Sequence, residues 1–356
     1  MLPMSHSLME TIMIKYDIES DLNFIFNKCK NEFNLLSNKS ILITGGTGFF
    51  GKWFLELIFY ANKNYNTNIL TTLITRNENK FFLENPHYKN NKFLKIIQID
   101  ILDLKKINHK FDFLLHMAAT SAIETFNGET DTNKTRTLFN GAKNIMEIAI
   151  ENNISKILFT SSGVVYGSSS KDMKDESDVS YSLNLEKRNG LAKGKILAED
   201  IISNLSLENN INFKIARCFS FVGPYLPLDI HYAIGNFIND AIFKDKILIN
   251  GNGSPYRSYL YISDTLIWLT KLLVGNEEGV FNVGSERRIQ IIELANMVRD
   301  IIAPSKEVII QEKEMHEGNF KRDVYLPNTA KIRKSLGVKE WTSLENAISK
   351  TAKFTS

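Results

Sequence analysis

The sequence predicts an α/β fold, in which a doubly wound parallel sheet is joined to a smaller C-terminal lobe. Up to about residue 218, short apolar runs alternate with longer segments of helical periodicity, and this order is typical of parallel sheets with helices on both faces. A glycine-rich stretch at residues 45–51 separates the first apolar run from the helical segment after it. Beyond residue 220 the alternation is lost, and Pro and Gly residues interrupt the pattern, so the smaller lobe is expected there.

Length, composition and charge indicate a soluble globular protein. The chain has 356 residues, of which 43% are hydrophobic and 23% are charged, as in ordinary globular domains. A net charge of +3 is too small to indicate a nucleic acid or a membrane surface as partner. No apolar run reaches membrane-spanning length, and residues 1–20 lack the apolar centre of a signal peptide. A cytoplasmic location is therefore expected.

The two cysteines are far apart in the sequence and are expected to be buried free thiols. Cys29 falls on the apolar face of a helical segment, and Cys218 follows an apolar strand. Nothing in their spacing suggests a disulfide framework or a zinc site. The helical segment around Cys29, residues 21–37, precedes the first strand, so residues 1–38 are predicted to be a helical extension with Asp21 as its N-cap.

The glycine-rich turn predicts a dinucleotide site. An apolar strand at residues 41–44 runs into Gly45, Gly46, Gly48 and Gly51, and an apolar helix follows. Glycine is needed here because the turn is sharp, the backbone must approach a pyrophosphate, and the helix must pack closely on the strand. The free N–H groups and the positive dipole end of the helix then face the phosphates. The candidate cofactor contacts in this turn are Gly45, Thr47, Gly48, Phe49, Phe50 and Gly51.

The residue after the second predicted strand bears on the choice of coenzyme. This strand covers residues 69–75 and ends in Thr75-Arg76-Asn77. An acidic residue at this position binds the adenosine ribose in many NAD-binding folds, whereas an arginine can accommodate the 2′-phosphate of NADP. Arg76 could equally be a solvated surface side chain. The cofactor is therefore predicted to be NAD or NADP, with Arg76 favouring NADP.

The next two predicted strands, residues 94–99 and 111–116, are followed by further candidate cofactor contacts. An acidic residue after the first of them is placed to meet the adenine, and small residues after the second let the backbone lie against the dinucleotide. These candidates are Asp100, Ile101, Ala118 and Ala119. His116 ends a buried strand, and we interpret it as a core histidine with a hydrogen-bond partner rather than a catalytic one.

The remaining predicted elements complete the alternation. Helical segments at residues 133–150 and 191–206 flank a strand at 156–160, and a further strand covers 213–217. Asp264 is expected to cap a later apolar helix. The alternation of these elements again predicts a parallel, doubly wound sheet.

Several motifs occur in a fixed order, and together they resemble the nucleotide-sugar epimerase/dehydratase family of extended short-chain dehydrogenases/reductases over about residues 39–350. The motifs are Thr44–Gly51, His116–Ala119, Ser161–Gly167, Arg217–Pro224, Arg257–Tyr261 and Asn282–Ser285. They are specific for the family and much less specific for the reaction. The resemblance implies a Rossmann domain at residues 39–220 and a mainly substrate-binding lobe at 221–356 that interleaves with it.

The resemblance also implies an enzyme whose substrate is a nucleotide sugar. In that family the bound nicotinamide takes a hydride from a sugar carbon, usually C4, and the ketone permits epimerisation, water loss or decarboxylation. The hydride chemistry belongs to the cofactor, while the protein supplies orientation and proton transfer. Family members often dimerise through the helices that correspond to residues 133–150 and 191–206, so a homodimer is expected.

Proton transfer in the family uses a Ser or Thr together with a Tyr-x-x-x-Lys pair, whose lysine lowers the pKa of the tyrosine. Ser162 matches the serine, four residues before Tyr166, and the candidate catalytic residues are Ser162, Lys195 and Tyr166. Lys195 matches the lysine because Glu199 follows four residues later, as the family often shows. Lys195 is also a candidate cofactor contact.

The tyrosine of that pair is missing. The residue four before Lys195 is Leu191, and in the alternative register, with Lys193 as the lysine, the position is Asn189. Leucine cannot donate or accept a proton, so three explanations stay open: another group acts, the reaction needs less help from a base, or the protein binds its ligands without ordinary turnover. The other groups available in the sequence are Tyr166, Tyr181, Lys193 and Lys195.

The resemblance places the substrate contacts in the second lobe and at the serine. The candidates are Ser162, Ser220, Asn236, Arg257 and Arg322, with His231 beside them. The two arginines match positions that hold the nucleotide diphosphate, for which a planar guanidinium is suited. Gly163-Val164 replaces the Asp-Glu of 4,6-dehydratases, which argues against that reaction. The sequence therefore predicts an NAD(P)-dependent nucleotide-sugar enzyme with an altered proton-transfer site, and the alternative is a non-catalytic or weakly active binding protein.

Overall fold

The structure, a computed structural model, describes residues 16–119, 128–167, 172–178, 188–230, 232–311 and 324–355. Its centre is a seven-stranded sheet, in which neighbouring strands are parallel and follow the order β12-β7-β5-β4-β1-β2-β3. The strands are β1 (Ser40–Thr44), β2 (Leu70–Thr75), β3 (Leu94–Gln98), β4 (Phe113–His116), β5 (Lys156–Ser162), β7 (Asn212–Cys218) and β12 (Gly279–Val283). The order reverses between β1 and β4, where doubly wound sheets bind their ligands. The predicted fold class is confirmed.

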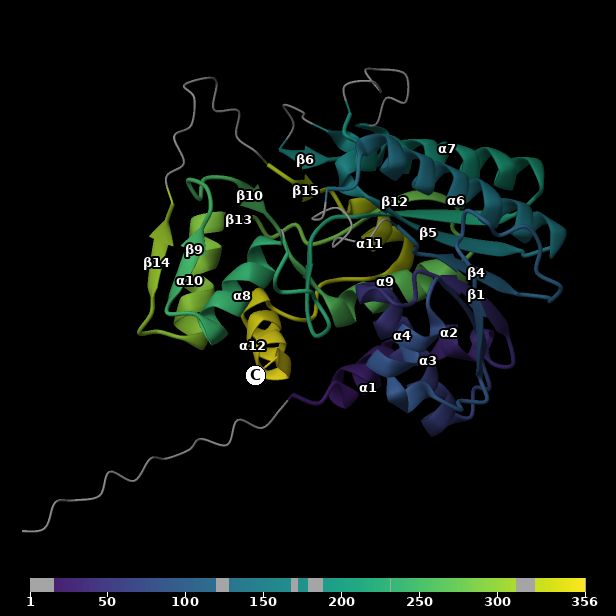
Figure 1. Ribbon diagram of the computed structural model, residues 1–356, viewed down its shortest axis with the longest axis horizontal. Coiled ribbons are helices and arrows are strands. Elements are labelled where there is room, and N and C mark those ends of the chain that lie inside the picture. The colour runs from purple at the N-terminus through teal and green to yellow at the C-terminus, as the bar shows by residue number, and fades with distance from the viewer. Residues whose placement is uncertain are drawn as a thin grey trace, which may run out of the picture.

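Helices cover both faces of this sheet (Figure 1). The four that pack on it are α3 (Phe49–Tyr65), α6 (Asp131–Glu151), α7 (Gly190–Glu208) and α9 (Ile262–Val274). α6 and α7 lie side by side on one face, and α3 and α9 lie on the other. In β1, Ile41 and Ile43 belong to the core on the α3 side, whereas Leu42 belongs to the core on the α6 side. A continuous apolar run therefore suits a strand that is buried on both faces.

A second group of elements lies on the left of Figure 1. The parallel pair β9–β14 packs with α8 and α10, and α12 contacts both of these helices. This group comprises α8 (Ala233–Phe243), α10 (Ile291–Ile302), α12 (Leu344–Thr355), β9 (Lys246–Ile249) and β14 (Glu307–Ile310). None of the helices in the described ranges combines the length and the apolar character that a membrane span requires.

Short elements complete the described chain. Three two-stranded pairs, β10–β13, β11–β8 and β15–β6, form outside the large sheet. Their strands are β6 (Met173–Lys174), β8 (Phe221–Val222), β10 (Tyr256–Arg257), β11 (Leu260–Tyr261), β13 (Ile289–Gln290) and β15 (Leu326–Pro327). The short helices are α4 (Glu78–Glu84), α11 (Ala330–Leu336), η1 (Pro86–Tyr88), η2 (Gly163–Tyr166) and η3 (Glu176–Asp178).

Two helices precede the sheet, where the sequence predicts a single helix over residues 21–37. They are α1 (Glu19–Lys28) and α2 (Lys30–Leu36), and the break falls at Cys29. Both pack against α9, which is buried along almost its whole length. Cys29 and Cys218 are buried free thiols, as predicted.

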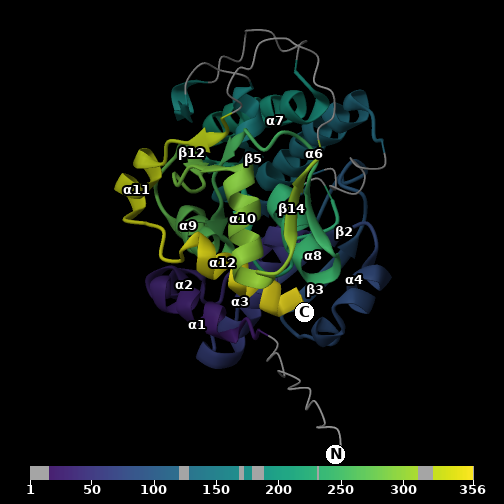
Figure 2. The same cartoon turned by 90° about the vertical axis from the view of Figure 1, so that its left-hand side faces the viewer.

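Asp21 does not cap α1, so that prediction is wrong. The N-cap is Ile18, and Asp21 lies inside the first turn with 2% of its surface exposed. Its carboxylate accepts hydrogen bonds from the hydroxyls of Tyr16 (2.7 Å) and Tyr261 (2.5 Å) and from Lys350 Nζ (2.7 Å). Tyr261 belongs to β11 and Lys350 to α12, so one buried carboxylate joins α1 to two segments that are distant in the sequence. In Figure 2, α1 and α2 lie below α9 and α12.

Asp264 is not an N-cap either. α9 begins at Ile262, and Asp264 lies in its first turn, fully buried. Its Oδ2 accepts hydrogen bonds from the backbone N–H groups of Trp341 (2.8 Å) and Thr342 (2.9 Å), and burial raises its pKa to about 6. The carboxylate fixes the segment that leads into α12. In both cases an acidic residue near a helix start bonds to another segment instead of to its own helix.

Candidate active site

The glycine turn between β1 and α3 is shaped by a close backbone contact. Gly45 has a φ of +73°, in the left-handed region that favours glycine. A Cβ at this position would lie 2.5 Å from the carbonyl carbon of Met117 and 2.6 Å from the backbone nitrogen of Ala118. Because Met117 and Ala118 follow β4, the turn is pressed against the end of the neighbouring strand, and only glycine fits.

The other glycines of the turn have different surroundings. A Cβ at Gly51 would lie 2.3 Å from Gly46 Cα, so the missing side chain lets α3 pack directly on the turn. A Cβ at Gly48 would meet only the Gly45 carbonyl oxygen, at 3.4 Å. Gly48 is the N-cap of α3, and no side chain in the described part of the chain caps this helix. The N-terminus of α3 therefore has no side chain over its N–H groups at Gly48, and a dinucleotide pyrophosphate needs such accessible N–H groups.

Two loops at the same edge of the sheet hold other candidate cofactor residues. Arg76 is exposed directly after β2. After β3, Asp100 Oδ1 accepts a hydrogen bond from the N–H of Leu102 (2.9 Å). The carbonyl of Ile101 accepts a hydrogen bond from Asn144 Nδ2 (2.9 Å), which ties this loop to α6. The strands of a parallel sheet end at one edge, so these loops and the glycine turn share it.

Ala118 and Ala119 follow β4 beside the glycine turn. The Ala118 N–H donates to Thr44 Oγ1 (3.2 Å), and a second hydrogen bond joins Thr44 Oγ1 to His116 Nδ1 (2.7 Å). Burial lowers the pKa of His116 to about 3, so its imidazole is neutral at physiological pH. His116 is the core histidine that the sequence predicts.

Ser162 is the last residue of β5 and the N-cap of η2. Its Oγ accepts a hydrogen bond from the Val164 N–H (3.3 Å). Burial raises the pKa of the Tyr325 phenol, and the nearby Ser162 side chain partly counters this. The Tyr325 hydroxyl oxygen lies 2.6 Å from the position that a Cβ at Gly163 would take. It therefore occupies the space that the next side chain along β5 and η2 would need.

Lys195 is buried in α7, with 4% of its surface exposed. Its Nζ donates to the carbonyl of Thr160 (2.7 Å) and lies 4.6 Å from the centre of the Phe159 ring, both on β5. Burial lowers its pKa to about 8. Lys195 thus contacts β5 at Phe159 and Thr160, near the end of the strand where Ser162 lies.

The start of α7 contains no phenol. The helix begins at Gly190, so Leu191 lies in its first turn, and Lys195 follows one turn later on the same side. Asn189, the residue of the alternative register, is the N-cap, and its Oδ1 accepts a hydrogen bond from the Ala192 N–H (2.9 Å).

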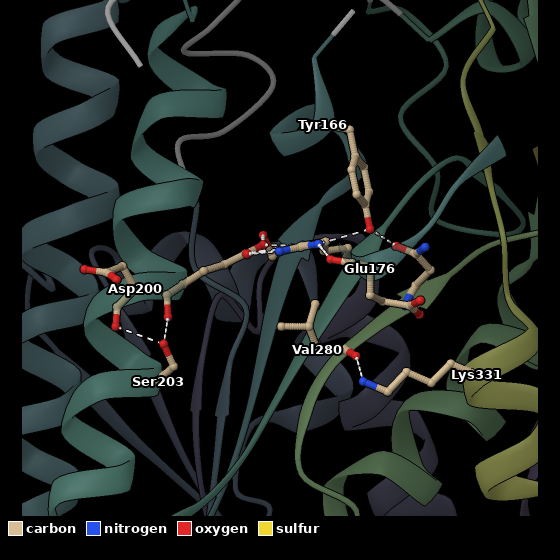
Figure 3. Close-up of polar contacts among 10 residues, drawn as sticks. Tyr166, Glu176, Asp200, Ser203, Val280 and Lys331 are labelled. Carbon is tan, nitrogen blue, oxygen red and sulfur yellow. Dashed lines mark hydrogen bonds and ion pairs between the residues drawn. The ribbon is translucent and has the colours of Figure 1, made fainter. Parts of the chain in front are cut away.

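Tyr166 belongs to a buried polar network, which Figure 3 shows. Its hydroxyl donates to Asn282 Oδ1 (2.6 Å) and accepts from Arg217 Nη1 (3.1 Å). Arg217 also forms a fully buried ion pair with Glu199 (Nη2 to Oε2, 2.7 Å) and donates to the carbonyl of Glu176 (2.8 Å). Burial raises the pKa of Tyr166 to about 12. The Tyr166 hydroxyl therefore both donates and accepts a hydrogen bond within the protein core.

The candidate substrate residues lie on several short elements. The carbonyl of Ser220, between β7 and β8, accepts a hydrogen bond from the N–H of Leu260 (3.0 Å). Asn236 is half-buried in α8. Arg257 ends β10, and its guanidinium carbon lies 5.9 Å from the centre of the Tyr325 ring. The residues outside the described ranges are Tyr181, His231 and Arg322.

Tyr325 is a residue at Ser162 that the sequence analysis does not predict. It follows Val324, which bridges to Tyr256, and its N–H donates to the Tyr256 carbonyl (3.1 Å). Its ring lies 4.7 Å from that of Phe219, centre to centre. No motif or spacing links Tyr325 to Ser162 in the sequence, because the contact is made only when the chain folds.

A doubly wound parallel sheet with a glycine turn and a bare helix N-terminus beside its switch point defines a Rossmann-type protein. The chain belongs to the NAD dependent epimerase/dehydratase family, whose model matches residues 41–284. It is 27% identical over 302 residues to UDP-glucuronic acid decarboxylase 3 of Arabidopsis thaliana, which is 84% of each chain. It is also 27% identical to the UDP-N-acetyl-alpha-D-glucosaminuronate decarboxylase of Bacillus cytotoxicus, over 76% of this chain and 83% of the relative.

Solved structures share the fold at lower identity. An epimerase of Methanothermobacter thermautotrophicus superposes with a TM-score of 0.76 at 20% identity, covering 92% of this chain and 95% of that one. A dTDP-glucose 4,6-dehydratase of Streptomyces venezuelae, solved with NAD bound, gives a TM-score of 0.71 at 20% identity, covering 88% of this chain and 96% of that one. At these identities the likeness concerns the fold alone.

Proposed function

We propose that the protein is an NAD(P)-dependent enzyme that modifies a nucleotide sugar, with a proton-transfer site unlike that of its family. The glycine turn is the observation that carries the proposal. The residues after β4 leave no room for a side chain at Gly45, and Gly48 leaves the N-terminus of α3 without a side-chain cap. The family match supports it, as do relatives that are by name decarboxylases of UDP-linked uronic acids. UDP-linked uronic acids are therefore the first substrates to test.

The proposed cofactor residues act through their backbone and their charge. The N–H groups at the start of α3 would hold the pyrophosphate, and the loops after β3 and β4 would line the rest of the cofactor. These residues are Gly45, Thr47, Gly48, Phe49, Phe50, Gly51, Asp100, Ile101, Ala118, Ala119 and Lys195. When bound, the nicotinamide accepts a hydride from a carbon of the sugar.

The proposed substrate residues hold the two ends of the sugar nucleotide. Arg257 offers a guanidinium to the diphosphate, and Arg322 is proposed for the same role by its motif. Ser162 donates or accepts a hydrogen bond at the reacting sugar hydroxyl. Ser220 and Asn236 are further proposed contacts of the sugar nucleotide.

The coenzyme is proposed to be NAD or NADP. Arg76, exposed after β2, favours NADP because a guanidinium there can meet the 2′-phosphate. Replacing Arg76→Ala should then weaken NADP binding about tenfold, which is about 1.4 kcal/mol, and leave NAD binding within about twofold. Titration of both coenzymes against both proteins measures this. Equal losses for NAD and NADP would show that Arg76 does not read the 2′-phosphate.

Binding and turnover together test the proposal. The purified chain is titrated with NADH and NADPH, then incubated with UDP-glucuronic acid, UDP-N-acetylglucosaminuronic acid, UDP-glucose and dTDP-glucose, and products are read by mass spectrometry. We expect coenzyme binding and conversion of at least one sugar. Coenzyme binding without any turnover would make the chain a binding protein, as Leu191 taken alone suggests, and absence of coenzyme binding would refute the proposal.

We also propose a Rossmann domain (39–220), preceded by a helical extension (1–38), and a mainly substrate-binding lobe (221–356). This lobe interleaves with the Rossmann core, since α9 packs on the large sheet and β12 belongs to it. A cytoplasmic homodimer formed through α6 and α7 is proposed as well, since these helices form an outer layer of the molecule (Figure 1). Light scattering on the purified chain measures the oligomeric state, and a monomer at micromolar concentration would refute the dimer.

A further inference from the structure

The hydroxyl of Tyr325 lies beside Gly163, the residue after Ser162, although α7 supplies no phenol near this serine. We propose that Tyr325, from the segment just before β15, transfers the proton that the tyrosine of α7 transfers in the rest of the family. The inference deepens the proposed function and rests on it, since it concerns the same sugar hydroxyl.

The position of the Tyr325 hydroxyl carries the inference. It lies 2.6 Å from where a Cβ of Gly163 would be, beside the residue that follows Ser162 in the chain. Ser162 is the residue proposed to hold the reacting sugar hydroxyl. A phenol whose oxygen lies beside residue 163 is within reach of a sugar hydroxyl held at residue 162, directly or through the serine.

Two sequence departures fit together around this phenol. Leu191 removes the family tyrosine from α7, and Gly163 leaves the space beside Ser162 without a side chain. The Tyr325 hydroxyl and the ring of Phe219, 2.9 Å from the ideal Cβ position of Gly163, fill that space. Any side chain at residue 163 would have to displace the phenol, so Gly163 and Tyr325 are coupled by geometry.

Tyr325 also lies on the path that the proposed substrate would take. The guanidinium of Arg257, proposed to hold the diphosphate, is 5.9 Å from the centre of the Tyr325 ring, and Gly163, the residue after Ser162, is at the hydroxyl end. The backbone of Tyr325 is fixed by its hydrogen bond to Tyr256 (3.1 Å). The phenol is therefore held between the two proposed ends of a sugar nucleotide.

Other candidate groups are engaged elsewhere. The Tyr166 hydroxyl bonds to Asn282 and Arg217, within the core. Lys195 Nζ donates to the carbonyl of Thr160 and would supply charge beside the cofactor. Among the described candidates, Tyr325 is the phenol whose hydroxyl lies beside Gly163, next to Ser162.

The proton transfer balances with the hydride transfer of the proposed function. The sugar O–H bond would break and its proton would pass to the Tyr325 phenolate, directly or by way of Ser162, as a C=O bond forms, and the oxidised nicotinamide, when bound, would accept the C–H electron pair as hydride. The phenolate becomes a phenol, the alcohol becomes a ketone, and the coenzyme is reduced. In the reverse step the phenol returns its proton to the sugar oxygen.

The surroundings of Tyr325 predict an alkaline pH profile. Burial raises the pKa of its phenol, Cys218 and Tyr166 raise it further, and the nearby Ser162 side chain and the charge of Arg257 only partly counter this. In the family pair, a neighbouring lysine lowers the pKa of the tyrosine instead. We therefore expect the oxidation rate to increase with pH above neutrality.

The first experiment removes the phenol from the full-length chain. Tyr325→Phe should bind NADH and the UDP-sugar with affinities within about threefold of the original, but should reduce bound NAD about 10²–10⁴-fold more slowly in a single turnover. Tyr88→Phe is the matched control, because Tyr88 is a buried phenol packed against Phe59 and Phe81 near the opposite edge of the sheet. It should leave rate and binding unchanged.

The second experiment moves the phenol back to α7. In the double variant Leu191→Tyr/Tyr325→Phe the hydroxyl would stand one turn from Lys195, so we expect partial recovery of the rate and a rise that begins at lower pH. Gly163→Ala should reduce the rate by displacing the phenol. Full activity of Tyr325→Phe, or loss of activity with an unchanged pH profile, would overturn the Tyr325 assignment while coenzyme binding still supports the proposed function.

Discussion

The glycine turn and the Ser162 corner, meaning Ser162, Lys195 and Tyr325, are built in opposite ways. The turn consists of consecutive residues, 45–51, and offers backbone N–H groups that are held in place by contact with Met117 and Ala118. The corner uses side chains from β5, α7 and the segment before β15. A backbone site depends on glycines at fixed positions, whereas a side-chain site depends only on where each functional atom ends. A side-chain site can therefore receive the same functional group from a different helix, strand or loop.

The largest effect is expected in the turn itself. In Gly45→Val the new Cβ would clash with the peptide between Met117 and Ala118, and valine would have to adopt the left-handed φ that Gly45 has. We therefore expect a loss of about 4 kcal/mol in the free energy of unfolding. Gly48→Ala is the matched control, because its Cβ meets only one atom at 3.4 Å. It should cost less than about 1 kcal/mol but weaken NADH binding about tenfold or more. Equal stability losses in both variants would refute this division of roles.

A slightly smaller loss is expected in the network below the Ser162 corner. Glu199→Ala leaves the buried Arg217 guanidinium without its carboxylate partner, so we expect about 3–4 kcal/mol of destabilisation in urea unfolding. The double variant Glu199→Leu/Arg217→Leu removes both charges and should lose less than the single variant. If the single variant is as stable as the original, the network does not support the corner.

Protonation of His116 should lower the free energy of unfolding as the pH decreases. Its folded pKa of about 3 lies below the ordinary value of 6.5, so the unfolded chain binds a proton first as pH falls. Stability is then fully present above pH 6.5 and is lost as pH decreases toward 3, by about 2 kcal/mol between pH 7 and pH 5. Urea unfolding at both pH values measures this loss. His116→Gln should reduce the difference, whereas His109→Gln, at an exposed site, should retain it.

The smallest losses of stability are expected at Asp21 and Glu345, two carboxylates outside the glycine turn and the Ser162 corner. Asp21→Ala removes a buried junction between α1, β11 and α12, and we expect about 2 kcal/mol of destabilisation, less than for a fully buried pair because Lys350 is partly exposed. Glu345→Ala breaks an exposed pair with Arg287 and should cost less than about 1 kcal/mol. A larger loss for Glu345→Ala in thermal or urea unfolding would reverse this ranking.

Patterns in the sequence predict the elements better than the partners of single side chains. Except for β12, which the sequence analysis does not predict, the sheet strands lie where apolar periodicity places them, and so do α3, α6 and α7. Burying a strand on two faces or a helix on one leaves a regular pattern in the sequence. Asp21 and Asp264 stand near helix starts, as an N-cap does, yet bond to distant segments. An acidic residue before an apolar run has the same local pattern in both cases, so tertiary contact decides its role.

The sequence by itself determined the α/β class, the glycine turn and the absence of a tyrosine at residue 191, because each depends on residues that are neighbours in the chain. Only the folded core brings Tyr166 between Arg217 and Asn282, and only the folded core brings the Tyr325 hydroxyl beside Gly163, next to Ser162. Spacing along a strand or helix fixes local geometry, whereas the meeting of distant side chains depends on how the whole core packs.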